Sequence, residues 1–407
     1  MIADVLIIGG GPAGLAAAIA AAKEGVKVVI AERRDLGGIL GQCIHNGFGL
    51  QYFGEELTGP EYAARFIDKL SGYRNIKVII GMVTSVSDDR NVEIISEDGL
   101  ISVRAKAIIM ATGCRERPRG ALEIAGTRPA GVMTAGTAQR LINVEGKQVG
   151  KRIVLLGSGD IGLIMARRLT FEGAKIEAVL EIMPTHSGLQ RNISQCLNDF
   201  NIPLELSTTV VEVCGRTRVD GVITAKVDNF LNPIPGTEKH IKCDALILSV
   251  GLIPENDLTP FIPIDPRTKG AIVDSHCMTQ AAGFFACGNA LHVHDVVDYV
   301  TEEGGIAGRY AALFARGKYP PSKTFALKSG NNVASIVPQR VIQEDGRVTL
   351  YIRVARPVNN AVISIMQDDI LIKSVSKYAV APNEIVSVSL PCQSISSDLT
   401  VYVGEKE

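Results

Sequence analysis

The feature that most constrains this chain is a glycine-rich turn inside an uncharged run of eighteen residues, 5–22. A run of this length could span a membrane, but Gly9, Gly10, Gly11 and Pro12 fall in its middle. Glycines supply turn conformations, and proline suits the first turn of a helix. We therefore predict a strand over 5–8, a helix over 12–23 and a strand over 27–31, with no membrane span. The start of the chain also lacks the positive charge of an export signal.

The turn has the spacing GxGxxG, with glycines at 9, 11 and 14. In a βαβ unit Gly9 allows the tight turn, Gly11 lets a pyrophosphate approach the backbone, and Gly14 lets helix and strand pack closely. Glu32 ends the second strand, where a carboxylate can accept hydrogen bonds from both ribose hydroxyls of an adenosine. These residues predict dinucleotide binding; the alternative is a purely structural glycine turn.

The same pattern occurs a second time. A strand over 153–156 leads to Gly157, Gly159 and Gly162, and a helix to about residue 172 precedes a strand over 175–180 and Glu181. The acid lies 24 residues after the first glycine, against 23 in the N-terminal copy. Two such units in one chain predict that two dinucleotides are brought together, which favours redox chemistry.

Other segments are expected to complete these units. Residues 105–113 and 243–256 are each expected to form a buried strand followed by a glycine-containing turn, and each would close one nucleotide-binding sheet. Residues 270–292 are typical of two short strands and a turn, followed by a helix from about 296 to 315. After about residue 323 the apolar residues alternate with period two, which predicts a β-sandwich of six or seven strands with a docking or packing role.

Composition excludes several classes of protein. The 42 Lys and Arg nearly balance the 43 Asp and Glu, which disfavours a nucleic-acid binder. None of the eight cysteines lies closer than ten residues to another, which excludes zinc ribbons, iron–sulfur runs and CxxC redox pairs. Scattered thiols are typical of the reducing cytoplasm. A chain of 407 residues predicts two or three domains.

With both motifs in place, residues 2–317 resemble the two-dinucleotide flavoproteins of the pyridine nucleotide–disulfide oxidoreductase superfamily. The stretches GGILGQCIHNGFG, ATGCRERPRG and RPAGVMTAGTAQRLIN are similar to the FAD/NAD subunits of multi-subunit dehydrogenases. That group includes sarcosine oxidase, dye-linked proline dehydrogenase, hydrogen cyanide synthase and the flavoprotein partnered with anaerobic glycerol-3-phosphate dehydrogenase; GDIGLIMARRLTFEGAKI and LHVHDVVDYV favour the last.

The resemblance implies an α/β fold with two Rossmann-like FAD and NAD(P) domains of glutathione-reductase type, plus the C-terminal all-β sandwich. The expected domain bounds are 1–115 and 251–322 for FAD, 116–250 for NAD(P) and 323–407 for the sandwich.

The resemblance also implies the cofactor contacts. FAD is expected at Gly9, Gly11, Gly14 and Glu32, and the nicotinamide dinucleotide at Gly157, Gly159, Gly162 and Glu181. The further cofactor-binding residues that we expect are Pro12, Ala13, Arg33, Gly38, Gln42, Cys43, Val83, Ala111, Thr112, Gly113, Asp160, Ile161, Gly251, Gly288, Asn289 and His294. The helix after Gly288 would stabilise negative charge on the reduced flavin ring. In the superfamily an Asp commonly follows that glycine; Asn289 can still hydrogen-bond the ribityl chain.

Glu181 favours NAD(H) over NADP(H). A 2′-phosphate about 4 Å from this carboxylate would be repelled by roughly 4 kcal/mol at an effective dielectric constant near 20. No arginine follows Glu181 before Arg191 to offset that repulsion. The alternative is that the Glu181 side chain faces solvent.

Cys43 separates this chain from the disulfide reductases, which carry two cysteines five positions apart at this point. A single thiol cannot cycle as a disulfide on its own. Cys43 is therefore either a redox nucleophile that turns over as a sulfenic acid, with His45 as a neighbour that lowers its pKa, or a plain wall of the flavin pocket, or a distant core residue.

His292, His294, Asp295 and Asp298 form a further polar group in LHVHDVVDYV. Consecutive residues of an extended segment point to opposite sides, which weakens a metal site here. We expect no metal and interpret the group as a polar rim of the flavin pocket.

Together these features predict an FAD-dependent NAD(H) oxidoreductase that acts as one subunit of a larger dehydrogenase, with a homo-oligomer left open. Two alternatives remain: a self-sufficient NADH oxidase or peroxidase that uses Cys43, and a non-catalytic subunit that holds a nucleotide.

Overall fold

The computed structural model describes residues 1–320 and 323–406, and these residues form two compact units. The first unit comprises Met1–Cys114 and Pro254–Glu407, and the second comprises Arg115–Ile253. The chain passes between them through β8 (Cys114–Glu116) and β18 (Leu252–Pro254), which pair as a two-stranded sheet. The expected boundary at residue 322 lies outside the described residues. Within the described ranges, no helix is long and apolar enough to cross a membrane.

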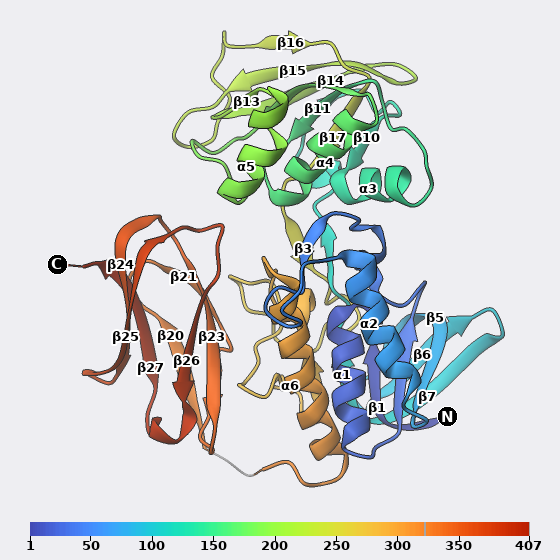
Figure 1. Cartoon of the computed structure of the whole chain (residues 1–407), viewed down its shortest axis with the longest axis vertical. Coiled ribbons are helices and arrows are strands. Elements are labelled where there is room, and N and C mark those ends of the chain that lie inside the picture. The colour runs from blue at the N-terminus through green and yellow to red at the C-terminus, as the bar shows by residue number, and fades with distance from the viewer. Residues whose placement is uncertain (321–322, 407) are drawn as a thin grey trace. The chain divides into compact units, whose positions relative to one another are not determined.

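The first unit is built on a six-stranded sheet (Figure 1). Its strands are β1 (Ile2–Ile8), β2 (Val28–Glu32), β5 (Ile76–Val86), β6 (Asn91–Ser96), β7 (Gly99–Met110) and β19 (Phe284–Ala286). Strand β1 lies between β2 and β7 and is parallel to both, whereas β6 is antiparallel to β5 and β7. The uncharged run 5–22 is therefore a central strand followed by a buried helix, and both are apolar because the sheet is covered.

Helices α1 (Pro12–Lys23) and α6 (Val297–Ala315) lie side by side against this sheet (Figure 1). Gly304 and Gly308 make this possible, because a Cβ there would lie 2.3 Å from Ala13 O and 2.1 Å from Ala17 O. Helix α2 (Gly59–Ser71) begins with a capping box formed by Thr58 and Glu61. The short hairpin β3 (Asn46–Phe48) and β4 (Leu57–Thr58) precedes it.

The prediction of two short strands within 270–292 was only partly correct. In this described stretch only β19 is a strand. The other pairings are three isolated bridges, which join Ile264 to Ala271, Val273 to Thr279 and Met278 to Phe285. The apolar residues there pack on the sheet, but tight turns interrupt the pairing. The helix expected from 296 begins at Val297.

The second unit contains a five-stranded parallel sheet. In spatial order its strands are β10 (Val132–Thr134), β17 (Ala245–Leu248), β11 (Arg152–Leu156), β12 (Lys175–Leu180) and β13 (Leu204–Glu205). Helices α3 (Ala135–Asn143), α4 (Asp160–Phe171) and α5 (Gln190–Cys196) share one core with this sheet. A second sheet shares its other core; its strands are β16 (Lys239–Ile241), β15 (Val219–Lys226), β14 (Thr208–Gly215) and β9 (Ala125–Gly126).

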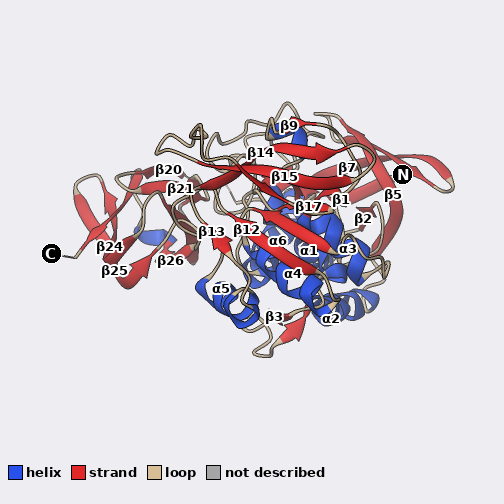
Figure 2. Cartoon of the chain, turned by 90° about the horizontal axis from the view of Figure 1, so that it is seen from above, coloured by secondary structure: helices blue, strands red, loops and turns tan. Residues whose placement is uncertain are grey.

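The C-terminal part of the first unit is a β-sandwich, seen as an almost all-strand region near the C-terminus in Figure 2. One sheet contains β22 (Arg340–Ile342), β20 (Thr324–Ser329), β27 (Leu399–Glu405), β24 (Val358–Gln367) and β25 (Ile370–Val380). The other contains β21 (Val333–Val337), β23 (Arg347–Val354) and β26 (Val386–Pro391). The described residues thus form eight strands, one more than the upper expectation, around a shared apolar core.

The sandwich packs on the rest of the first unit through a buried histidine. His276 is 1% exposed, and its Nε2 lies 2.8 Å from Glu344 Oε1 of the sandwich. Its Nδ1 lies 3.0 Å from the Tyr319 hydroxyl, its ring stacks on Tyr310, and its backbone N–H donates to Asp274. Burial lowers the pKa of His276, although the neighbouring carboxylates oppose that shift.

Candidate functional site

The N-terminal glycine turn has the three features expected from its spacing. Gly9 has φ +106°, and a Cβ there would lie 2.3 Å from Ala111 O. At Gly14 a Cβ would lie 1.9 Å from Gly9 O, so helix and strand meet backbone to backbone. A Cβ at Gly11 would meet nothing within 4 Å, and no side chain caps the first N–H groups of α1. An open helix N-terminus with free N–H groups fits a pyrophosphate.

Glu32 closes this turn from the neighbouring strand. Its carboxylate is 7% exposed and accepts the Gly10 N–H at 2.7 Å and the Arg34 N–H at 2.9 Å. Arg33, also expected at the cofactor, is an exposed side chain beside it. The carboxylate therefore lies at the carboxyl end of β2, next to the open turn.

A loop packs against the backbone of the turn. Gly37 donates its N–H to Gly10 O at 2.8 Å, and a Cβ at Gly38 would lie 3.0 Å from Gly11 Cα. The 3₁₀ turn Gly38–Gln42 then leads to Cys43, which is half-buried and whose backbone is bonded to Leu40 and Gly59. Cys43 therefore directly follows the loop segment that packs against the turn.

The residues that follow β7 lie beside the glycine turn, at Gly9. Ala111 donates its N–H to Ile8 O, and the Thr112 hydroxyl donates to Glu255 O at 2.6 Å. Gly113 has φ +72° and would accept a Cβ without contact. Val83, by contrast, is 8% exposed and its side chain belongs to the core on one face of the sheet, so only its backbone edge is available to a ligand.

The returning segment packs on the first turn of α1. A Cβ at Gly288 would lie 2.9 Å from Ala13 Cβ, so the 3₁₀ turn Gly288–Ala290 sits against that helix. Asn289 is half-buried; its Nδ2 donates to Cys114 Sγ at 3.6 Å, and its Oδ1 accepts the His294 N–H at 3.0 Å.

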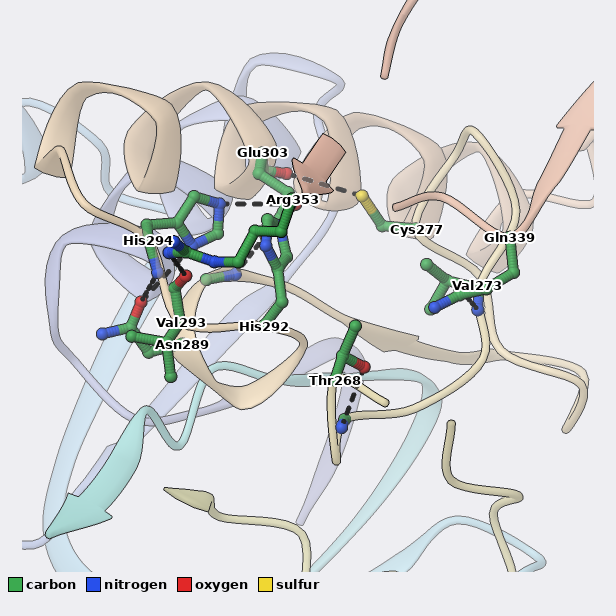
Figure 3. A network of polar contacts seen from close by, with 12 residues as sticks. Thr268, Val273, Cys277, Asn289, His292, Val293, His294, Glu303, Gln339 and Arg353 are labelled. Carbon is green, nitrogen blue, oxygen red and sulfur yellow. Dashed lines mark hydrogen bonds and ion pairs between the residues drawn. The ribbon is translucent and has the colours of Figure 1, made fainter. Parts of the chain in front are cut away.

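The polar group at 292–298 is arranged differently from the expectation. His292 and His294, two positions apart, point to the same side and meet Glu303 of α6, a residue that sequence reasoning missed (Figure 3). Asp295 turns away to Arg353 of the sandwich, and Asp298, fully buried, accepts the Gln51 N–H at 3.5 Å. The sequence did contain a signal for this contact: Glu303 lies in the helix predicted over 296–315, which directly follows the two histidines.

In the cluster of His292, His294 and Glu303, the pKa values of His292 and Glu303 are strongly shifted. Burial and the neighbouring His294 lower the pKa of His292 to about 4. Burial alone would raise the pKa of Glu303, but the two histidines hold it at about 2. The carboxylate is therefore ionised within the protein interior.

The glycine turn of the second unit repeats the first. Gly157 has φ +98°, and a Cβ there would lie 2.0 Å from Ser249 O, while one at Gly162 would lie 2.7 Å from Ser249 Cβ. Gly159 has more room, with its nearest neighbour at 3.5 Å. Ser249, which sequence reasoning missed, fixes the turn by accepting the Gly162 N–H.

The flanking residues of this turn have different roles. Asp160 Oδ1 accepts from Leu189 N at 2.9 Å and Asn192 Nδ2 at 2.6 Å, so its side chain ties the start of α4 to the start of α5. Ile161 is half-buried and packs on the helix-side core. Gly251 has φ +102° and accepts the Arg117 N–H.

Glu181 does not face solvent. It is 5% exposed, and its Oε2 accepts from Ser158 N at 3.0 Å, from Ser158 Oγ at 2.5 Å and from Ser187 Oγ at 3.1 Å. Its Oε1 accepts the Met183 N–H at 3.0 Å. The alternative of a solvent-facing carboxylate is therefore wrong, and a fixed negative charge stands at the carboxyl end of β12.

Comparisons with known proteins agree with this geometry. The family model described as "Pyridine nucleotide-disulphide oxidoreductase" matches residues 3–307. An NADH dehydrogenase of Ferdinandcohnia aciditolerans is 26% identical over 70% of this chain and 52% of that protein. One opine oxidase subunit of Agrobacterium tumefaciens is 24% identical (77% and 65%), and one alkyl hydroperoxide reductase subunit of Pseudomonas aeruginosa is 28% identical (71% and 54%).

Solved structures show the same fold. Thioredoxin reductase of Lactococcus lactis has a TM-score of 0.63 at 23% identity, covering 77% of this chain and 99% of that one. Thioredoxin reductase of T. acidophilum has a TM-score of 0.62 at 25% identity, covering 78% and 99%. The chain spans 52–65% of the length of these three curated relatives.

Proposed function

Because the chain belongs to the pyridine nucleotide-disulphide oxidoreductase family, we propose that it is a flavoprotein that transfers hydride between NAD(H) and FAD. FAD would bind at Gly9–Gly14, Glu32 and Gly288–Asn289, and the nicotinamide dinucleotide at Gly157–Gly162 and Glu181. When bound, FAD supplies the two-electron chemistry. The residues of the chain supply binding, orientation and charge.

The observation that carries this proposal is the common construction of the two turns. In each, the first and third glycines are packed against backbone or a neighbouring side chain, whereas the middle one leaves room for a ligand. In each, a buried glutamate at the end of the next strand accepts a backbone N–H of the turn. Free N–H groups at a helix start bind phosphate, and the acid accepts from ribose hydroxyls.

The fixed charge of Glu181 supports a preference for NAD(H). Its carboxylate is held by four hydrogen bonds from Ser158, Ser187 and Met183, so it cannot swing away from a 2′-phosphate. Repulsion of roughly 4 kcal/mol at about 4 Å corresponds to about a thousandfold in affinity.

We also propose that the chain works with a partner dehydrogenase subunit, to which it passes or from which it receives electrons. One relative is itself named as a subunit of an oxidase, and residues 308–407 lie beyond the family match. A cytoplasmic location is part of the proposal and is supported by eight cysteines that are all free thiols.

Anaerobic titration tests the function. The purified protein should contain FAD, and stoichiometric NADH should bleach its visible absorption, whereas NADPH at the same concentration should act far more slowly. Bound FAD that NADH does not bleach would favour the non-catalytic alternative. A screen of electron acceptors and a pull-down with a tagged chain would then identify the partner.

The second candidate function uses Cys43, which is favoured by its position beside the loop that packs against the glycine turn. An NADH oxidase or peroxidase of this kind would consume NADH rapidly with oxygen or peroxide, and Cys43→Ser would abolish that turnover while NADH still bleaches the flavin. Unchanged peroxide turnover in Cys43→Ser would eliminate this candidate.

A further inference from the structure

A buried group of two imidazoles and one carboxylate lies between helix α6 and the loop that follows β19. The ligand atoms of His292, His294 and Glu303 all lie within 4.8 Å of one another. Their side chains are 8%, 0% and 4% exposed. Figure 3 shows the three side chains gathered where α6, which carries Glu303, meets the loop that carries His292 and His294. This set lies beside the proposed FAD-binding residues, because Glu303 accepts the Gly288 N–H and Asn289 accepts the His294 N–H, but none of its three side chains is assigned a step in the proposed hydride transfer.

The hydrogen bonds of Asn289 determine which nitrogen of His294 carries a proton. Asn289 Oδ1 accepts the His294 backbone N–H at 3.0 Å, which fixes the orientation of the amide. The same oxygen lies 3.3 Å from His294 Nδ1, so Nδ1 must be the protonated nitrogen. In a neutral ring, Nε2 then presents a lone pair.

That lone pair faces another acceptor. His294 Nε2 lies 3.7 Å from Glu303 Oε1, is buried and has no hydrogen-bond partner among the described residues. Two buried acceptors facing each other are unfavourable unless a cation lies between them. The cation is either an extra proton on His294 or a metal ion.

Two of the three separations between the ligand atoms are close to those around a metal ion, and the third, between the two histidines, is at most 4.8 Å. Tetrahedral zinc with bonds of about 2.0–2.1 Å places its ligand atoms about 3.3–3.4 Å apart. The observed separations from Glu303 Oε1 are 3.2 Å to His292 Nε2 and 3.7 Å to His294 Nε2. Two histidines and one glutamate are a known zinc ligand set with one position left open.

The surroundings of the three residues also fit a bound metal ion. Glu303 Oε2 accepts the Gly288 N–H at 2.5 Å, so Oε1 is the oxygen that faces the two histidines. The bond from His294 Nδ1 to Asn289 orients the ring in the way that hydrogen-bond partners orient metal-bound histidines. Arg353, the nearby cation, forms an ion pair with Asp295, so its charge is compensated. Tyr351 of the sandwich lies 5.5 and 5.7 Å from the two imidazole rings and covers them.

We propose that His292 Nε2, His294 Nε2 and Glu303 Oε1 bind a divalent transition-metal ion, with zinc as the best fit. The ion links the loop that carries Asn289 to helix α6 beneath the sandwich. All three ligand side chains are buried, so the ion would be shielded from bulk solvent.

The test is the metal content of the full-length protein, expressed without a histidine tag in medium supplemented with zinc and passed over a chelating resin. Wild-type protein should retain stoichiometric zinc by elemental analysis and release it on unfolding. Glu303→Gln preserves the size of the side chain and its bond from Gly288, but it removes the charge. Glu303→Gln and His294→Gln should each lose at least nine tenths of the metal, as expected from a roughly ten- to hundred-fold loss of metal affinity or more, whereas His240→Gln on an exposed strand of the second unit should retain it.

Expression with cobalt in place of zinc gives a second readout that does not require the variants to fold. Tetrahedral coordination should produce cobalt d–d bands at longer wavelength than flavin absorption. Wild-type protein that carries no stoichiometric metal under either condition overturns the proposal and assigns the cluster to an imidazolium–carboxylate pair. Metal that persists in folded Glu303→Gln and His294→Gln overturns it as well. Neither readout depends on NADH oxidation, so failure of the proposed function leaves this test intact.

Discussion

Replacing Gly11 by alanine should separate cofactor binding from folding. The residue has φ −75° and an extended ψ, which alanine also adopts, and the added Cβ would meet no protein atom within 4 Å. The apo protein should therefore change in stability by no more than about 1 kcal/mol, the scale of a helix N-cap substitution. The methyl group would instead occupy the space through which a pyrophosphate reaches the free N–H groups of α1.

The loss can be estimated from one hydrogen bond to a charged group, about 1.5–3 kcal/mol. Gly11→Ala should thus weaken FAD binding about ten- to hundred-fold. The assay is fluorescence titration of deflavinated protein with FAD, together with thermal unfolding without cofactor. Gly14→Ala is the matched comparison, since its Cβ would lie 1.9 Å from Gly9 O and should destabilise the apo protein by about 1–3 kcal/mol or more. Wild-type FAD affinity in a folded Gly11→Ala protein would refute the assignment of this turn.

Three further predictions concern other parts of the molecule. Glu181→Gln keeps the size of the side chain but removes the charge, so the ratio of kcat/KM for NADPH over NADH should rise by roughly ten-fold or more; an unchanged ratio would contradict the electrostatic argument. On helix α6, Gly305→Ala meets nothing within 4 Å and should stabilise by about 0.5–1 kcal/mol, whereas Gly308→Ala, with a Cβ 2.1 Å from backbone oxygen, should lower Tm. For His276 the folded pKa is depressed by burial, so the unfolded chain binds protons first as pH falls below about 6.5. The free energy of unfolding should therefore fall as the pH drops below about 6.5, and it should fall less in His276→Gln. Burial raises the pKa of Asp274, so protonation of Asp274 at lower pH favours the folded state and opposes this loss. Urea unfolding at several pH values measures this, and equal slopes in both proteins would argue against it.

The parts of the fold that sequence predicted best are those governed by short-range chemistry. Gly9, Pro12 and Gly14 specify where a strand ends and a helix begins, and β1, α1 and β2 follow the expected ranges within a few residues. The second unit repeats this between β11 and β12. Local residue types suffice here because turn geometry and helix initiation depend on neighbours in the chain.

Long-range packing accounts for what the sequence did not predict. Glu303 joins His292 and His294 only because α6 runs back beside the loop, a consequence of the glycine contacts between α6 and α1. The four hydrogen bonds to Glu181 come from loops whose course no periodicity encodes.

The contact between the sandwich and the loop that follows β19 bears on how this chain can be shortened. Arg353 bonds to Val293 O and Asp295, Ile385 donates its N–H to Asp295, and Val337 and Tyr351 belong to the same apolar core as Leu291. Truncation at residue 307, where the family match ends, would strip these side chains of their cover and admit water to the loop. The minimal cooperative folding unit therefore extends past the residues that match the family, and expression trials should retain the tail.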